Sequence, residues 1–119
     1  MITTDNIKKD ERIVIVGKRY NPQLGTYITG PYVGRIARVN KCTFTVKFDK
    51  ESDNEWYPKT FDFAGFAKKR TNCIYGSMHY EAYSVPDAIC LCERHIEKYD
   101  PKCLKVKELK RAIDKLAGL

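Results

Sequence analysis

Four residues of this chain, Cys90, Cys92, His95 and Cys103, have the side chains that bind zinc. Thiolates and a neutral imidazole form tetrahedral sites in which every ligand lies roughly 2.0–2.3 Å from the ion. The spacing disfavours such a site, because residues 86–98 are expected to be helical. Cys90 and Cys92 would then point about 200° apart at about 100° per residue. We therefore expect thiols packed in a core and no bound metal, with a zinc site as the alternative.

Catalysis by a thiol would need a nearby base, and the chain has only two histidines, His79 and His95. We expect His79 to face outward from a strand and His95 to lie near the solvent boundary of a helix. The sequence contains no P-loop, no Gly-x-Ser-x-Gly motif and no pattern of paired carboxylates. We predict a protein that is not an enzyme and has no cofactor.

Basic and aromatic residues are interleaved along the first half of the chain, and the net charge of the protein is +7. A basic balance favours anionic partners, and aromatic rings stack on unpaired bases beside cations that contact phosphates. We predict that the protein binds DNA or RNA. Arg35 and Arg38 are three residues apart in an expected strand, so we expect them to face opposite sides. The candidate nucleic-acid-binding residues are Arg19, Tyr32, Arg35, Arg38, Lys41, Lys47 and Trp56.

A protein partner is the alternative to nucleic acid. Tyr and Trp are enriched at the hot spots of interfaces, and cations surround the apolar stripe of the last expected helix. The protein would then be a small adaptor or inhibitor, for example of viral or mobile-element origin, that acts on an acidic protein partner through the same side chains. The sequence is consistent with a monomer or a dimer. The helix cations are Lys102, Lys105, Lys107, Lys110, Arg111 and Lys115.

The cysteine usage and hydropathy favour an intracellular protein. Five irregularly spaced cysteines do not form a disulfide framework, so we expect reduced thiols. The apolar run at residues 13–16 is far shorter than the roughly 20 residues that span a bilayer. The first residues lack the basic and apolar regions of a secretory signal. We expect a cytoplasmic location and no membrane partner.

The candidate residues lie on elements that read as strands. Residues 12–16, of which 13–16 are β-branched, predict a buried strand that Gly17 ends. The turn-forming residues 19–25 predict a loop. Residues 27–31 either continue this loop or form a short edge strand.

A hairpin gives the clearest local signal. Residues 32–39 and 42–48 read as two strands, joined by Asn40-Lys41 with Asn40 at positive φ, as a type I′ turn requires. Strict alternation in the second strand places one face on a core and one in water. We expect Phe44 and Val46 to be buried.

The rest of the chain changes from strand to helix. Residues 56–63 and 78–83 read as further strands, the latter with Met78, Tyr80 and Ala82 facing inward. Pro86 suits the first turn of a helix, and Asp100-Pro101 repeats this start signal. Apolar residues then recur at spacings of three and four, and Gly118 stands where the second helix should end.

These elements predict an α+β fold, in which a small antiparallel sheet or partly open barrel precedes two C-terminal helices. We expect one domain over residues 1–119. It comprises a loose lead-in at 1–11, a β-rich part at 12–83 and a helical part at 85–118.

Two segments carry a resemblance to known families. Gly34-Arg35-Ile36-Ala37-Arg38-Val39 and Thr43-Phe44-Thr45-Val46-Lys47-Phe48 are similar to the central hairpin of five-stranded Tudor, KOW and Src-homology-3-like barrels. The resemblance covers roughly residues 12–63. It implies a small barrel that binds nucleic acids, proline-rich peptides or methylated side chains rather than one that catalyses a reaction. The two C-terminal helices do not belong to that pattern.

Overall fold

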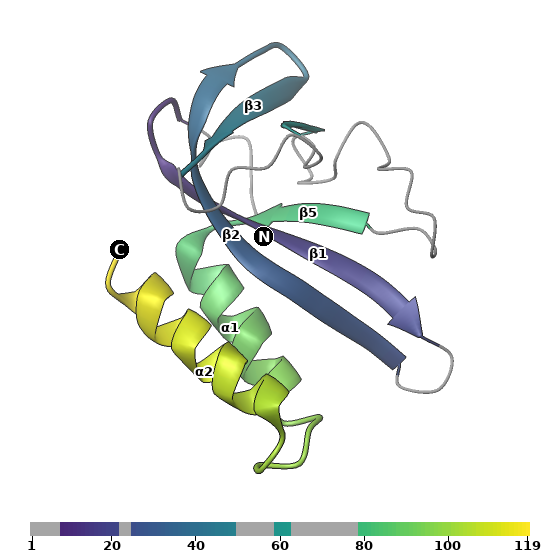
Figure 1. The fold of residues 1–119 in the computed structure, drawn as a ribbon. Helices are drawn as coiled ribbons and strands as arrows, with labels where there is room; N and C mark the ends of the chain where they lie inside the picture. The colour runs from purple at the N-terminus through teal and green to yellow at the C-terminus, as the bar shows by residue number, and fades with distance from the viewer. Residues whose placement is uncertain (1–7, 22–24, 50–58, 63–78) are drawn as a thin grey trace.

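The computed structural model describes residues 8–21, 25–49, 59–62 and 79–119. In these ranges five antiparallel strands precede two helices, which confirms the predicted α+β class. The strands lie in the order β4-β3-β2-β1-β5 and curl into a nearly closed barrel. Both helices pack side by side against one side of the β1–β2 pair (Figure 1). The elements are β1 (Arg12–Asn21), β2 (Gly25–Val39), β3 (Thr43–Phe48), β4 (Thr60–Asp62), β5 (His79–Tyr83), α1 (Val85–Ile96) and α2 (Leu104–Ala117).

Strand β1 is buried on both faces, which explains its continuous run of β-branched residues. Ile13 and Ile15 face the barrel interior, where they pack with residues from all four other strands. The edge strands β4 and β5 both contribute to this inner cluster, so the sheet must curl to bring them together. The partners of Ile13 and Ile15 in the inner cluster are Ile36, Phe44, Val46, Phe48, Phe61 and Ala82.

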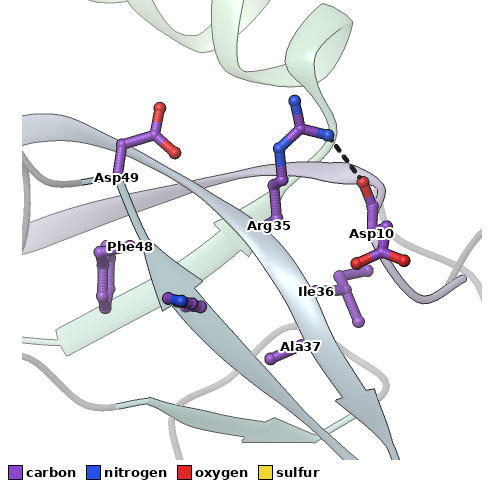
Figure 2. A pocket seen from close by; sticks show the side chains of 7 residues that line it. Asp10, Arg35, Ile36, Ala37, Phe48 and Asp49 are labelled. Atoms are coloured by element: carbon purple, nitrogen blue, oxygen red, sulfur yellow. Dashed lines mark hydrogen bonds between the residues drawn. The ribbon is translucent and has the colours of Figure 1, made fainter.

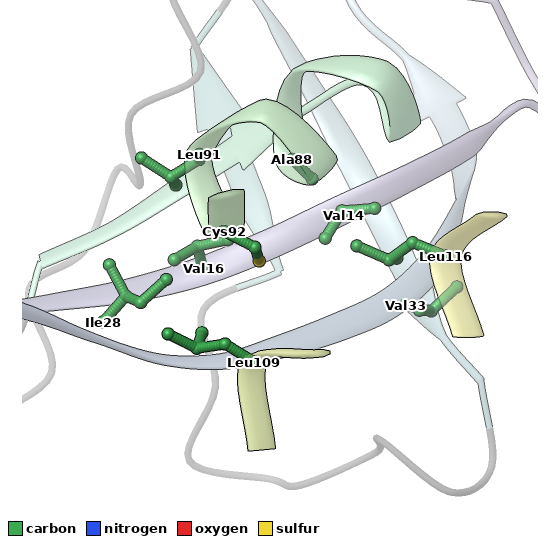
Figure 3. Close-up of a cluster of buried hydrophobic side chains, with 9 residues drawn as sticks. All are labelled: Val14, Val16, Ile28, Val33, Ala88, Leu91, Cys92, Leu109 and Leu116. Carbon is green, nitrogen blue, oxygen red and sulfur yellow. The ribbon is translucent and has the colours of Figure 1, made fainter. Parts of the chain in front are cut away.

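The opposite side of the sheet, here called the outer face, is covered in part by the helices. Val14 and Val16 point to this side because side chains alternate along a strand, and Ile28 and Val33 of β2 join them. Figure 3 shows helix residues packed against these four side chains. The helix residues are Ala88, Leu91 and Cys92 of α1 with Leu109 and Leu116 of α2.

The predicted β2–β3 hairpin is confirmed, with Phe44 and Val46 buried, but its turn differs from the prediction. The Asn40 N–H donates to the Thr43 carbonyl at 2.7 Å, so Lys41 and Cys42 form the connection, one residue later than expected. In the described ranges the only non-glycine residue with positive φ is Asp10, so Asn40 does not adopt the predicted conformation.

Strands β1 and β2 are longer than the sequence suggests. Gly17 does not end β1 but is buried within it, opposite Thr29. The register shifts at this point, so that Gly30 and Pro31 of β2 oppose the single residue Val16. Such a bulge accommodates an extra residue without ending the strand, and Gly30 has the φ of +95° that glycine tolerates. The loop expected over 19–25 is therefore wrong wherever the structure describes it, and of the two alternatives for 27–31 the strand is the correct one.

The helices begin and end close to the predicted positions. Ser84 caps α1 by accepting a hydrogen bond from the Asp87 N–H at 3.3 Å, and Pro86 lies in the first turn. Helix α2 begins at Leu104 rather than at Asp100-Pro101, because the Asp100 carboxylate instead accepts from the Lys102 N–H in a turn. Gly118 follows the last turn of α2, as expected.

Two shorter strands complete the sheet. Phe61 of β4 is buried, and Tyr80 and Ala82 of β5 face the inner cluster as predicted. The predicted strand residues 56–58, 63 and 78 lie outside the described residues. Within the ranges that the structure covers, no helix is long and apolar enough to cross a membrane.

Candidate nucleic-acid interface

A second bulge in β2 decides where the two candidate arginines point. Arg35 pairs with Lys47 and Arg38 pairs with Thr45, and the register shifts between them at Ala37. Thr45 and Lys47 both lie on the outer face, because Phe44, Val46 and Phe48 fill the inner one. Arg35 and Arg38 therefore share the outer face, and the expectation that they face opposite sides is wrong. An extra residue in one strand reverses the alternation beyond it.

The outer face of β2 and β3 is basic where the helices do not cover it. Arg35, Arg38, Lys41 and Lys47 are all exposed, and we call these four residues the cationic strip. No Asp or Glu occurs from Gly25 to Phe48, so the cations are not interrupted by acids along these two strands. The Arg35 guanidinium donates to the Asp10 main-chain carbonyl at 3.0 Å, which leaves its charge unneutralised.

Threonine hydroxyls extend the same face toward β4. Thr43 and Thr45 alternate with the buried residues of β3, and Thr60 of β4 pairs with Thr45. Asp62, which pairs with Thr43, adds one carboxylate at this edge. Hydroxyls donate hydrogen bonds to phosphate oxygens without the bulk of a long side chain. The face thus combines charged and neutral donors.

An open hollow of about 490 Å³ lies beside the cationic strip (Figure 2). Arg35 and Lys47 contribute cations to it, and Asp10 and Asp49 contribute carboxylates. Asp49 forms an ion pair with Arg12 at 2.8 Å. The hollow therefore differs from the strip in offering hydrogen-bond acceptors as well as donors.

The remaining predicted binding residues are not brought to this surface. Tyr32 pairs with Ile15 and packs against the inner cluster, on the opposite face of β2 from Arg35. Arg12 of β1 pairs with Arg35 of the strip. Arg19 lies seven residues farther along β1, which is roughly 23 Å at the rise of a strand. Trp56 lies outside the described residues. An aromatic partner for the strip is therefore not identified in the described ranges.

The residues considered for zinc binding are separated as the helix predicts. Cys90 is exposed while Cys92 is buried on the other side of α1. In the part of the chain that the structure covers, no three Cys, His, Asp or Glu side chains gather as metal ligands would. Absence of bound zinc stays a prediction, which elemental analysis of the purified protein checks.

His95 is buried on α1, so its expected place at a solvent boundary is wrong. Its Nδ1 has no hydrogen-bond partner in the described part of the chain. Burial and, to a smaller extent, nearby positive charges together lower the pKa of His95 to about 4. The imidazole is therefore neutral at physiological pH. The charges belong to Lys98, Lys18, Arg94 and Lys105.

A polar cluster that sequence reasoning missed lies on the outer face near α1. Lys18 forms an ion pair with Glu81, which also accepts a hydrogen bond from the Tyr83 hydroxyl. The Lys18 ammonium lies 5.2 Å from the centre of the Tyr83 ring. Burial lowers the Lys18 pKa, but the hydrogen bonds and charges of Glu81 and Tyr83 outweigh it and leave that pKa raised. No local pattern could reveal this cluster, because the β1–β5 pairing joins residues far apart in sequence.

Comparison with known proteins finds no family, no curated protein and no solved structure that matches the chain. The fold and surface together define a general class, a small antiparallel barrel with a basic strand face and a helical layer.

Proposed function

We propose that this protein is a non-enzymatic, intracellular nucleic-acid-binding module whose contact surface is the cationic strip. The observation that carries the proposal is the bulge at Ala37, which places Arg35 and Arg38 on one exposed face with Lys47. Four cations without an intervening acid attract a polyanion. Arginine also suits phosphates because its planar fork donates two parallel hydrogen bonds.

The barrel supports binding rather than catalysis. Residues 12–63 resemble Tudor, KOW and Src-homology-3-like barrels, which present strand surfaces to ligands. The antiparallel strands and curled sheet are compatible with that architecture. The strip lies on the regular β2–β3 hairpin. A rigid pair of strands holds the cations at fixed spacing, so little conformational entropy is lost on binding.

Fluorescence anisotropy with labelled single-stranded and duplex DNA tests the proposal. We expect binding that weakens steeply between roughly 50 and 200 mM salt, with a logarithmic slope of about −0.7 per phosphate for single strands and −0.9 for duplexes. The Arg35→Ala/Arg38→Ala double variant should weaken binding to all sequences and flatten this slope. The control is Lys107→Ala/Lys110→Ala, which removes the same charge from exposed positions of α2.

Equal loss in both double variants would mean that net charge alone attracts the nucleic acid, and would overturn the assignment of the strip. No binding to DNA or RNA at low salt and micromolar protein would overturn the function itself. An acidic protein would then be the partner to seek, because the same cations would serve that interface.

A further inference from the structure

The hollow beside the strip differs from it in charge, and this indicates a different ligand group. Arg35 and Lys47 line the hollow together with Asp10 and Asp49, and the Asp49 carboxylate is paired with Arg12. The Asp10 carboxylate repels a phosphate, so the hollow attracts one less strongly than the strip does. A group that carries both donors and acceptors can instead bind to both kinds of side chain. A nucleobase is such a group.

Asp10 supplies the acceptor that is available to a ligand. Asp49 already accepts from the Arg12 guanidinium at 2.8 Å. The Asp10 carboxylate has no hydrogen bond or ion pair with another residue of the described ranges, yet its main chain is fixed. Its N–H donates to the Ile36 carbonyl at 2.7 Å, and its carbonyl accepts from Arg35 at 3.0 Å (Figure 2).

The hollow is large enough for a flat ring. Its volume of about 490 Å³ is within the usual range for small-molecule sites. Figure 2 shows Arg35 and Asp49 on one side of the β2–β3 pair and the Phe48 ring on the other. Ala37, at the bulge, contributes only a methyl group to the lining.

We infer that the hollow binds a guanine base while Arg38 and Lys41 of the cationic strip bind the adjoining phosphates; this inference rests on the proposed function. The Watson–Crick edge of guanine places its N1–H and its amino group side by side, where one carboxylate accepts from both. Its O6 follows on the same edge and accepts from Lys47 or Arg35. Adenine and cytosine present an amino group beside an acceptor that repels a carboxylate, and thymine presents one N–H between two carbonyls.

Short single-stranded DNA of thymines with one central base changed tests the inference without altering the protein. A good bidentate contact discriminates by about 1–3 kcal/mol. We therefore expect the guanine-containing strand to bind about 5- to 150-fold tighter than the all-thymine strand. Inosine keeps N1–H and O6 but lacks the amino group, so it should lose most of this preference. Free guanosine monophosphate, as competitor, should displace the strand only weakly if the phosphate contacts of the strip are also needed.

Asp10→Asn is the matched protein variant. Asn tolerates the φ of +70° at this position, keeps the size of the side chain, and removes its charge and one of its two acceptor oxygens. It should abolish the guanine preference without weakening binding to thymines. Glu11→Gln is the control, because Glu11 is exposed and adjacent but does not line the hollow. It should keep the preference.

The outcomes separate the two proposals. Salt-dependent binding without a guanine preference, or a preference that survives in Asp10→Asn, overturns the inference and leaves the proposed function standing. Failure of all strands to bind overturns both. Displacement by guanosine monophosphate as strong as by the strand would mean that a free nucleotide is the ligand, and would overturn the assignment of phosphates to the strip.

Discussion

His95 is a buried imidazole whose protonation opposes folding. Its pKa of about 4 in the folded protein arises first from burial and then from neighbouring positive charges, whereas an unfolded chain has the ordinary value of 6.5. The unfolded state therefore binds an extra proton between these two pH values. The stability that the neutral imidazole contributes is fully present above about pH 6.5 and is lost as the pH falls toward 4.

We predict that the free energy of unfolding decreases over this range by about 3 kcal/mol, at 1.36 kcal/mol for each pH unit between the two pKa values. Urea denaturation at several pH values measures it. His95→Leu should lose the histidine contribution, while His79→Gln should keep it, because His79 is exposed. An unchanged pH profile in His95→Leu would contradict the assignment.

Gly34 is a residue at which a side chain has no room. A Cβ there would lie 2.7 Å from the Lys47 carbonyl oxygen and 2.9 Å from Val46 Cγ1. The carbonyl belongs to the β2–β3 ladder and cannot move freely, so we expect Gly34→Ala to destabilise the protein by about 1–3 kcal/mol. Thermal or urea unfolding measures the change. Gly118→Ala is the control, because its new Cβ would have only ordinary contacts at 3.6 Å, and a loss of similar size there would contradict the steric explanation.

At the scale of elements, periodicity predicted the strands and helices better than their irregularities. The alternation of β3 identified Phe44 and Val46 as core residues, and both are buried. The bulges at Gly30-Pro31 and Ala37 depend on the pairing with β1 and β3, which a single segment does not contain. The shared face of Arg35 and Arg38 was missed for that reason.

The two faces of α1 can be distinguished by thiol chemistry. Cys90 is exposed, whereas Cys92 is buried and has a raised pKa because burial disfavours the thiolate. We predict that an alkylating reagent at mildly alkaline pH modifies Cys90 in the native protein and modifies Cys92 only on unfolding. Peptide mapping by mass spectrometry follows each site. Equal rates at both cysteines would show that α1 does not pack as described, and denatured protein gives the control in which both react.

At the scale of the whole molecule, composition and pattern were sufficient for the fold class but not for the site. The strand-then-helix order predicted the α+β arrangement. The hollow could not be predicted, because Asp10 meets β2 only after folding. Tyr32 was grouped with the cations by proximity in sequence, whereas the register turns it inward.

The two cores share one strand, and this coupling makes a prediction about unfolding. Ile13 and Ile15 belong to the inner cluster, while Val14 and Val16 belong to the cluster under the helices. Loss of the barrel would expose β1 and remove the surface on which α1 and α2 pack. A helical layer that depends on the barrel in this way should not unfold separately from it.

We therefore predict that Phe44→Ala, far from the helices in the inner cluster, destabilises the helices as much as the strands. Phe44 is fully buried and stacks on Phe61 at a centroid distance of 5.8 Å, so the loss should be about 3–5 kcal/mol. Circular dichroism of the helices and hydrogen exchange of the β2–β3 amides should report one shared, lowered midpoint. Leu109→Ala, in the helical cluster, is the reciprocal variant and should shift both signals together as well. A strand buried on both faces cannot lose one core and keep the other intact, so two separate transitions in either variant would contradict the coupling.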